Sequence, residues 1–185
     1  MNNKKLLANK RRVLCHELGH AIYFIKFIAP VYYNKIIKTD KGVILERNST
    51  IDIILSKDHF LGKYNNNGFL FRKEELPINE DILYSMAGFA MENIIYSFGF
   101  AKLIQFDEIT RLEEYSDAWL IREKAGKSSP YLEDLFRTAT DMLFPFGNRV
   151  YKQARLITSD IKKINEPIHL EEIDILKILG LSRPE

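Results

Sequence analysis

The sequence predicts an α+β fold that is predominantly helical, with a small β-sheet between the first helix and the later helices. Apolar residues recur with helical spacing near both ends of the chain, whereas residues 31–71 consist of β-branched and aromatic pieces separated by turn residues. The chain has 185 residues and 46% hydrophobic content, so it can bury a substantial core. We therefore expect a single domain over residues 1–185.

The first predicted helix covers residues 8–28, which contain no proline, and it ends at Ala29-Pro30. A glycine inside a helix costs about 1 kcal/mol relative to alanine, so Gly19 indicates a close approach by a substrate or a neighbouring backbone. A basic cluster precedes the middle of this helix. Its members are Lys4, Lys5, Lys10, Arg11 and Arg12. We expect the cluster to be a solvated first turn with a flexible tip over residues 1–9, although it could contact an anionic partner.

Four short strands are predicted at residues 31–38, 43–46, 51–55 and 69–71, and the first two form a hairpin. Asp40-Lys41-Gly42 and Asn65-Asn66-Asn67-Gly68 read as the breaks between strands. An edge strand of such a sheet could pair with an extended peptide. Alternatively, the strands only cover the core.

Helical spacing returns at residue 79 or 80, where small side chains at Ala87, Gly88 and Ala90 would allow close packing against the first helix. Thr110 and Glu113 form a predicted capping box that opens a helix ending near Ala125. Three further helices are predicted at residues 130–144, 147–163 and 170–179, with a cap between residues 168 and 173.

The motif His16-Glu17-Leu18-Gly19-His20 lies within the first predicted helix. Two histidines four residues apart share one helix face, and Glu17 projects beside them. Catalytic zinc takes three nitrogen or oxygen ligands and keeps one position for water, whose pKa falls to about 7. Glu17 could then remove a proton from that zinc-bound water. The motif predicts a metallopeptidase; the alternative is a surface helix with two incidental histidines.

Two carboxylates are candidates for a third metal ligand. Glu92 lies on the second long helix, where it could instead pair with a base or accept a hydrogen bond from a ligand imidazole. Asp117 interrupts a mostly apolar stretch, and a carboxylate drawn toward the interior needs a cation or a metal. Read alone, it would be an ordinary acid on a helix surface.

Other residues and the composition limit the remaining function classes. The single cysteine, Cys15, excludes an internal disulfide and is expected to be a buried thiol in a reducing compartment. His59 and His169 are expected to be ordinary surface histidines. The apolar run after His20 is too short for a membrane span, and no signal peptide is recognisable, so we expect a cytoplasmic protein without a membrane anchor. The net charge of +2 gives no argument for nucleic acid.

Several segments in order resemble the peptidase domain of the FtsH family of AAA proteases. They are His16–Ala21, reading HELGHA; a strand with Leu61-Gly62-Lys63-Tyr64; the helix from Met86 to Glu92; Ser116-Asp117 before an apolar helix; and the closing segment Glu166–Glu172. The similarity covers roughly residues 10–180. It implies a zincin-like peptidase domain with Zn²⁺ as cofactor.

The resemblance also implies roles for single residues. His16 and His20 match the histidine ligands, Glu17 matches the catalytic base, and Asp117 matches the aspartate ligand. Phe89 replaces the arginine of the family, and Asn93 replaces the second acid of its paired glutamates. The segment between Gly88 and Asp117 is longer than usual. This length makes Asp107 a rival ligand, but the helical spacing after Asp117 favours Asp117.

The chain shows no ATPase module or phosphate-binding loop, so we expect a freestanding relative of the peptidase domain. Such a protein would cut flexible or already extended polypeptide, or would use a separate unfoldase or adaptor. The sequence identifies no ring interface and leaves the oligomeric state open. Two other classes remain: a catalytically inactive zinc-binding relative that serves as a protein-interaction module, and a binder of nucleic acid or an anionic surface through residues 4–12.

Overall fold

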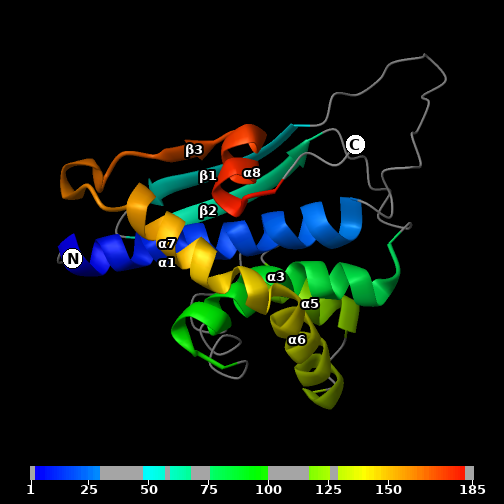
Figure 1. The fold of residues 1–185 in the computed structure, drawn as a ribbon. Coiled ribbons are helices and arrows are strands. Elements are labelled where there is room, and N and C mark those ends of the chain that lie inside the picture. Colours follow the sequence, from blue (N-terminus) through cyan, green and yellow to red (C-terminus); the bar gives the residue numbers. More distant parts are fainter. Residues whose placement is uncertain are drawn as a thin grey trace, which may run out of the picture.

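The computed structural model describes residues 3–29, 48–56, 59–67, 76–99, 117–125 and 129–181, and it confirms a mostly helical α+β architecture. Helix α1 (Asn3–Tyr23) runs along one face of a three-stranded antiparallel sheet, and helix α3 (Ile78–Tyr96) packs on the other side of α1 (Figure 1). The expected position of the sheet is therefore wrong. Helix α1 lies between the sheet and α3, because apolar residues of α1 face both layers.

Helix α1 begins at Asn3 rather than at Ala8 and continues as a π-helical segment, η1 (Phe24–Ile28). Lys10 departs from the expected solvated cluster, because its side chain is buried and its Nζ donates to three backbone carbonyl oxygens. These oxygens belong to Lys163, Ile164 and Glu166, at 3.0, 3.1 and 2.6 Å. Three acceptors compensate the buried ammonium group, and they attach α1 to the segment before the last strand.

The sheet has the order β2-β1-β3, with β1 at Asn48–Ser56, β2 at His59–Asn67 and β3 at Ile168–Leu170. The predicted strand 51–55 is confirmed and is longer at both ends. Asn65–Asn67 were predicted as a break but belong to β2, where the Asn65 amide donates to the side chains of Thr50 and Asp52. Such cross-strand bonds offset the low strand propensity of asparagine. The predicted strands 31–38, 43–46 and 69–71 lie outside the described residues.

The later helices are α5 (Asp117–Ala125), α6 (Ser129–Leu143), α7 (Gly147–Ile157) and α8 (Glu172–Leu179), with short 3-10 turns η2 (Phe144–Phe146) and η3 (Ile161–Lys163). The predicted helix 147–163 is too long. Helix α7 ends at Ile157, where the Thr158 hydroxyl donates to the Ala154 carbonyl and accepts a hydrogen bond from Arg11. The predicted capping box at Thr110 and Glu113 lies outside the described residues.

The C-terminal helix begins later than predicted. Residues 168–170 form β3 instead of a first turn, and α8 starts after Glu171. Glu171 and Asp174 form a capping box, which satisfies backbone donors at the start of this helix. A cap was predicted within residues 168–173, but the strand in front of it was missed, because three residues carry too little alternation to be recognised.

Helices α1 and α3 pack closely at Gly19. A Cβ atom on Gly19 would lie 2.6 Å from the Ala87 carbonyl oxygen and 2.8 Å from Cβ of Met91. The close approach predicted for Gly19 is thus made by a neighbouring backbone. Cys15 is fully buried in the same core, as expected. Within the described ranges, no helix combines the length and apolar character that a membrane span requires.

Candidate metal centre

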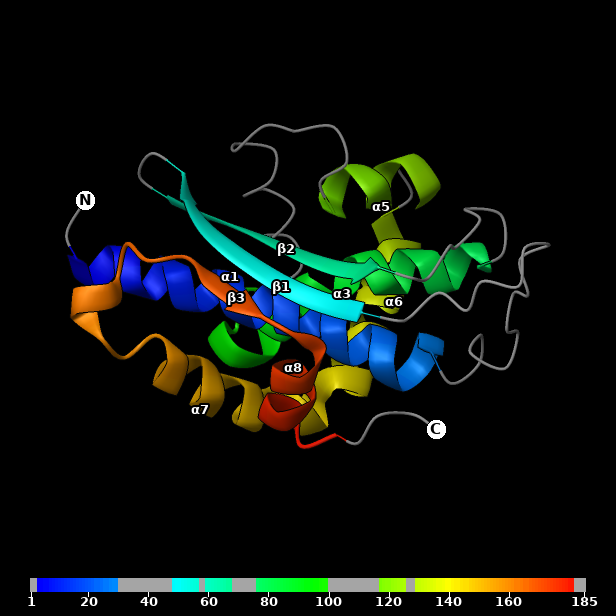
Figure 2. The same ribbon diagram turned by 90° about the horizontal axis from the view of Figure 1, so that it is seen from above.

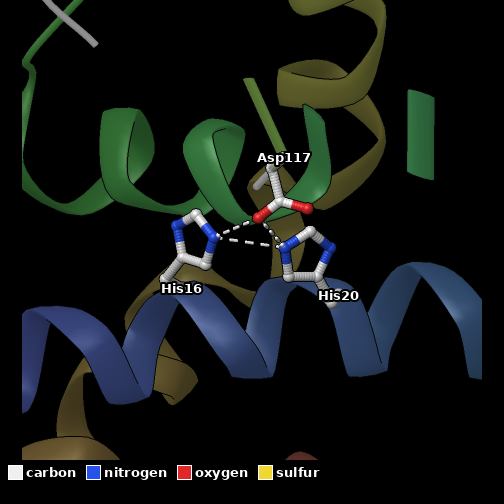
Figure 3. A group of neighbouring side chains, drawn as sticks. All are labelled: His16, His20 and Asp117. Carbon is white, nitrogen blue, oxygen red and sulfur yellow. Dashed lines mark hydrogen bonds and ion pairs between the residues drawn. The ribbon is translucent and has the colours of Figure 1, made fainter. Parts of the chain in front are cut away.

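The structure brings His16, His20 and Asp117 together, although Asp117 lies about a hundred positions farther along the chain. The Nε2 atoms of the two imidazoles are 3.2 Å apart, and Asp117 Oδ2 lies 2.9 Å from Nε2 of His16 and 3.1 Å from Nε2 of His20 (Figure 3). Helix α1 carries both histidines on one face, and Asp117 is the first residue of α5. The three residues named as metal ligands therefore point at one place.

The far side of each imidazole ring has its own acceptor. Nδ1 of His16 lies 2.8 Å from Oε1 of Glu92, and Nδ1 of His20 lies 3.0 Å from the backbone carbonyl oxygen of Tyr84. A carbonyl oxygen and an ionised carboxylate can only accept, so both Nδ1 atoms carry the hydrogen. Neutral rings in this tautomer place their lone pairs on Nε2.

Two nitrogen lone pairs and a carboxylate oxygen consequently face one another within 3.2 Å. Three acceptors at this distance repel one another unless a positive charge lies among them. A proton or a metal ion can supply that charge. Two imidazole nitrogens and one carboxylate oxygen form a donor set that catalytic zinc uses, with a further position left for water. The residues present thus fit zinc.

The electrostatics of the metal-free side chains agree with this geometry. Burial alone lowers the pKa of His16, but its hydrogen bonds to Asp117 and Glu92 outweigh burial and raise that pKa well above its ordinary value. Burial alone raises the pKa of Asp117, but the nearby His20 and His16 hold it far below the usual range. Asp117 therefore stays ionised, as a metal ligand must.

Glu17 lies beside these three residues and against strand β2. Its side chain is buried, and it touches the backbone of Gly62, where no Cβ atom could be accommodated. Burial raises the pKa of Glu17, while the neighbouring histidines and a hydrogen bond from the backbone N–H of Tyr64 lower it; the net shift is upward. Such a carboxyl group is suited to accept and return a proton near neutral pH.

Helix α3 forms the wall behind His16. A Cβ atom on Gly88 would collide with the His16 imidazole, so only glycine leaves space for this ring. Phe89 packs edge-on against the same ring, with centroids 5.1 Å apart. The small residues predicted to allow close helix packing thus also give the imidazole its place.

The other candidates fall into distinct positions. Glu92 contacts His16 at Nδ1, away from the three converging atoms, and its second oxygen lies 3.7 Å from Arg12 Nε. It therefore takes both roles given as alternatives to ligation, the partner of a base and the acceptor for an imidazole. Asp107 lies outside the described residues. Cys15 is buried, and burial raises the pKa of its thiol to about 12, so it remains a neutral thiol.

The two remaining histidines lie away from the centre. His59 and His169 are exposed, as expected, and His169 is held between Asp52 at 2.6 Å and Glu171 at 2.9 Å. Sequence reasoning missed Tyr84, which lies one helical turn before Gly88 and orients His20 through its backbone carbonyl. A backbone contact has no side-chain signature, so only the packing of α3 on α1 reveals it.

Comparison with protein-family models, with curated proteins and with solved structures gives no significant match.

Proposed function

We propose that the protein is a zinc-dependent endopeptidase that hydrolyses peptide bonds of flexible or unfolded polypeptide, in a zincin-like domain of the FtsH type. His16, His20 and Asp117 would hold the zinc ion, and Glu17 would be the general base. One observation carries this proposal: two Nε2 lone pairs and one carboxylate oxygen converge within 3.2 Å, with a buried carboxyl group beside them.

The chain's own groups account for the proton transfers. A zinc ion at this place supplies a Lewis acid that polarises the peptide carbonyl and acidifies water. Glu17 takes a proton from water as the new carbon–oxygen bond forms. It then returns that proton to the amine nitrogen as the carbon–nitrogen bond breaks. The raised pKa of Glu17 brings its basicity closer to the working pH.

The position of β2 supports a role in aligning substrate. Among the described strands, β2 pairs only with β1, so its other edge is not paired by a described strand. Figure 2 shows β2 on the side of the sheet where α5 lies, and Asp117 begins that helix. The Gly62 backbone touches Glu17, so an extended peptide added to this edge would pass beside the general base. Such pairing requires an unfolded segment, which an unfoldase or adaptor could deliver.

Measurements of zinc content and cleavage together test the proposal. The purified chain should bind one zinc ion per molecule and release fluorescent fragments from labelled, unfolded casein. A Glu17→Gln variant should keep the zinc and lose cleavage by a factor of at least about 10². Glu133, an exposed acid on α6, supplies the matched control, and Glu133→Gln should behave like the parent protein.

The outcomes separate the function classes. Zinc binding without cleavage in the parent protein would identify the inactive zinc-binding relative, and absence of zinc would overturn the metal centre itself. The described contacts do not favour a nucleic-acid binder. Lys10 donates to backbone carbonyls, Arg11 to Thr158, and Arg12 lies near Glu92, so these three cations are used within the molecule.

A further inference from the structure

Tyr84 places an aromatic ring directly against the metal centre. Its ring meets the His20 imidazole edge-on, with centroids 5.4 Å apart and planes at 62°, and it packs in a similar way against Phe24 at 6.4 Å. Its backbone carbonyl accepts the hydrogen bond from His20 Nδ1. Tyr84 thus contacts His20 through both its backbone and its side chain.

The hydroxyl group of Tyr84 is not explained by this packing. A phenylalanine ring would make the same contacts with His20 and Phe24. Within the part of the chain that the structure describes, the hydroxyl forms no hydrogen bond, and the residue is only half-buried. The charged or titratable groups that act on the phenol are Tyr64, Asp117, Glu17 and Asp81, so the phenol lies within electrostatic reach of the proposed ligand and base. This donor, which has no hydrogen-bond partner among the described residues, belongs to a ring that contacts the proposed ligand His20.

Peptide hydrolysis is accelerated by such a donor, in addition to the Lewis acid that a zinc ion supplies. When water adds to the peptide carbon, a carbon–oxygen bond forms, the water proton moves to Glu17, and the carbonyl π electrons move onto the carbonyl oxygen. That oxygen gains negative charge and is stabilised by preorganised hydrogen-bond donors. Glu17 cannot serve there, because it holds the proton needed by the leaving amine.

We propose, on the basis of the peptidase function above, that the Tyr84 hydroxyl donates a hydrogen bond to the carbonyl oxygen of the scissile peptide in the transition state. Tyr84 keeps its proton throughout, so it acts as an electrostatic catalyst. It is then a catalytic residue in addition to Glu17. Its contribution disappears when the amine leaves and the carbonyl double bond reforms.

A Tyr84→Phe variant tests this role, because it removes one oxygen atom and keeps the ring. We expect kcat for a fluorogenic peptide to fall by about 10²–10³, with KM changed by less than about twofold and zinc content unchanged. Tyr96 lies on the same helix and is not part of the site. The matched Tyr96→Phe variant should retain the parental kcat and zinc content.

A binding measurement gives a second readout that does not require turnover. A phosphinic peptide carries a tetrahedral, anionic centre, and calorimetry should show its affinity for Tyr84→Phe falling by about 10- to 100-fold. The corresponding amide peptide should bind equally well to Glu17→Gln with and without Tyr84→Phe, because its carbonyl oxygen is not charged.

Two results would overturn the role of Tyr84 alone: a parental kcat in Tyr84→Phe, or equal losses for the phosphinic and amide peptides, which would indicate packing only. A parent protein without zinc or cleavage would instead overturn the peptidase function on which this role rests.

Discussion

The carboxylate of Glu92 holds the imidazole of His16 from the side opposite to the converging ligand atoms, with Oε1 2.8 Å from Nδ1. This contact comes from α3, whereas the histidine belongs to α1. The hydrogen bond fixes the ring orientation and tautomer, and it increases the basicity of Nε2. The metal centre thus depends on the packing of two helices as well as on its three ligands.

Removing this carboxylate should weaken metal binding without abolishing it. We expect Glu92→Ala to reduce zinc affinity by about 10- to 100-fold, because His16 loses its orienting acceptor. Competition with a coloured chelator measures this change, and Glu133→Ala serves as the exposed control. Complete loss of zinc from Glu92→Ala, with zinc retained in Asp117→Ala, would show that Glu92 is the ligand.

The third ligand can be identified by comparing two aspartates. Asp117→Ala should lose bound zinc, because it leaves only two imidazole ligands at the centre. Asp107→Ala should retain zinc and cleavage. Metal analysis of both purified variants after dialysis decides between them, and an empty site in Asp107→Ala alone would contradict the role assigned to Asp117.

Alanine substitutions at two glycines should have different effects on zinc binding. A methyl group at Gly88 collides with the His16 imidazole, so Gly88→Ala should displace a metal ligand and lower zinc affinity. A methyl group at Gly62 collides with Glu17, so Gly62→Ala should retain zinc and lose cleavage. Zinc content and casein cleavage, measured on both variants, distinguish these effects. The same phenotype in both would show that the two glycines act only through stability.

The contribution of His169 to the free energy of unfolding should depend on pH. Hydrogen bonds to Asp52 and Glu171 raise the pKa of His169 above its ordinary value of about 6.5. A raised pKa in the folded state stabilises the protein fully below the unfolded-state pKa, and this contribution is lost as pH rises through the folded-state pKa.

The corresponding experiment compares urea unfolding of the parent and His169→Gln. The variant should be less stable near pH 6, and the difference should disappear toward about pH 9. A difference in the free energy of unfolding that stays constant over this range would show that the charge of His169 is not involved.

The sequence by itself determined the local part of this protein. Four-residue spacing on a helix places His16 and His20 on one face, and Glu17, which is next to His16 in the sequence, projects beside them. Strand 51–55, a helix that starts at residue 79 or 80 and a helix at residues 130–144 were also predicted, because each has a long or regular apolar pattern, and the structure has β1, α3 and α6 at these places. These features depend on neighbours within a few positions.

The tertiary structure decided what depends on distant segments. Asp117 could be preferred over Glu92 only through family resemblance, since spacing along the chain does not tell which carboxylate reaches the Nε2 side of His16. Lys10 attaches α1 to carbonyl oxygens more than 150 positions away, a contact that the sequence does not indicate. Tyr84 orients His20 through its backbone carbonyl oxygen, which has no signature in the sequence either. The order of the layers could also be seen only in the structure, because α1 is buried on two sides by segments distant in sequence, the sheet and α3.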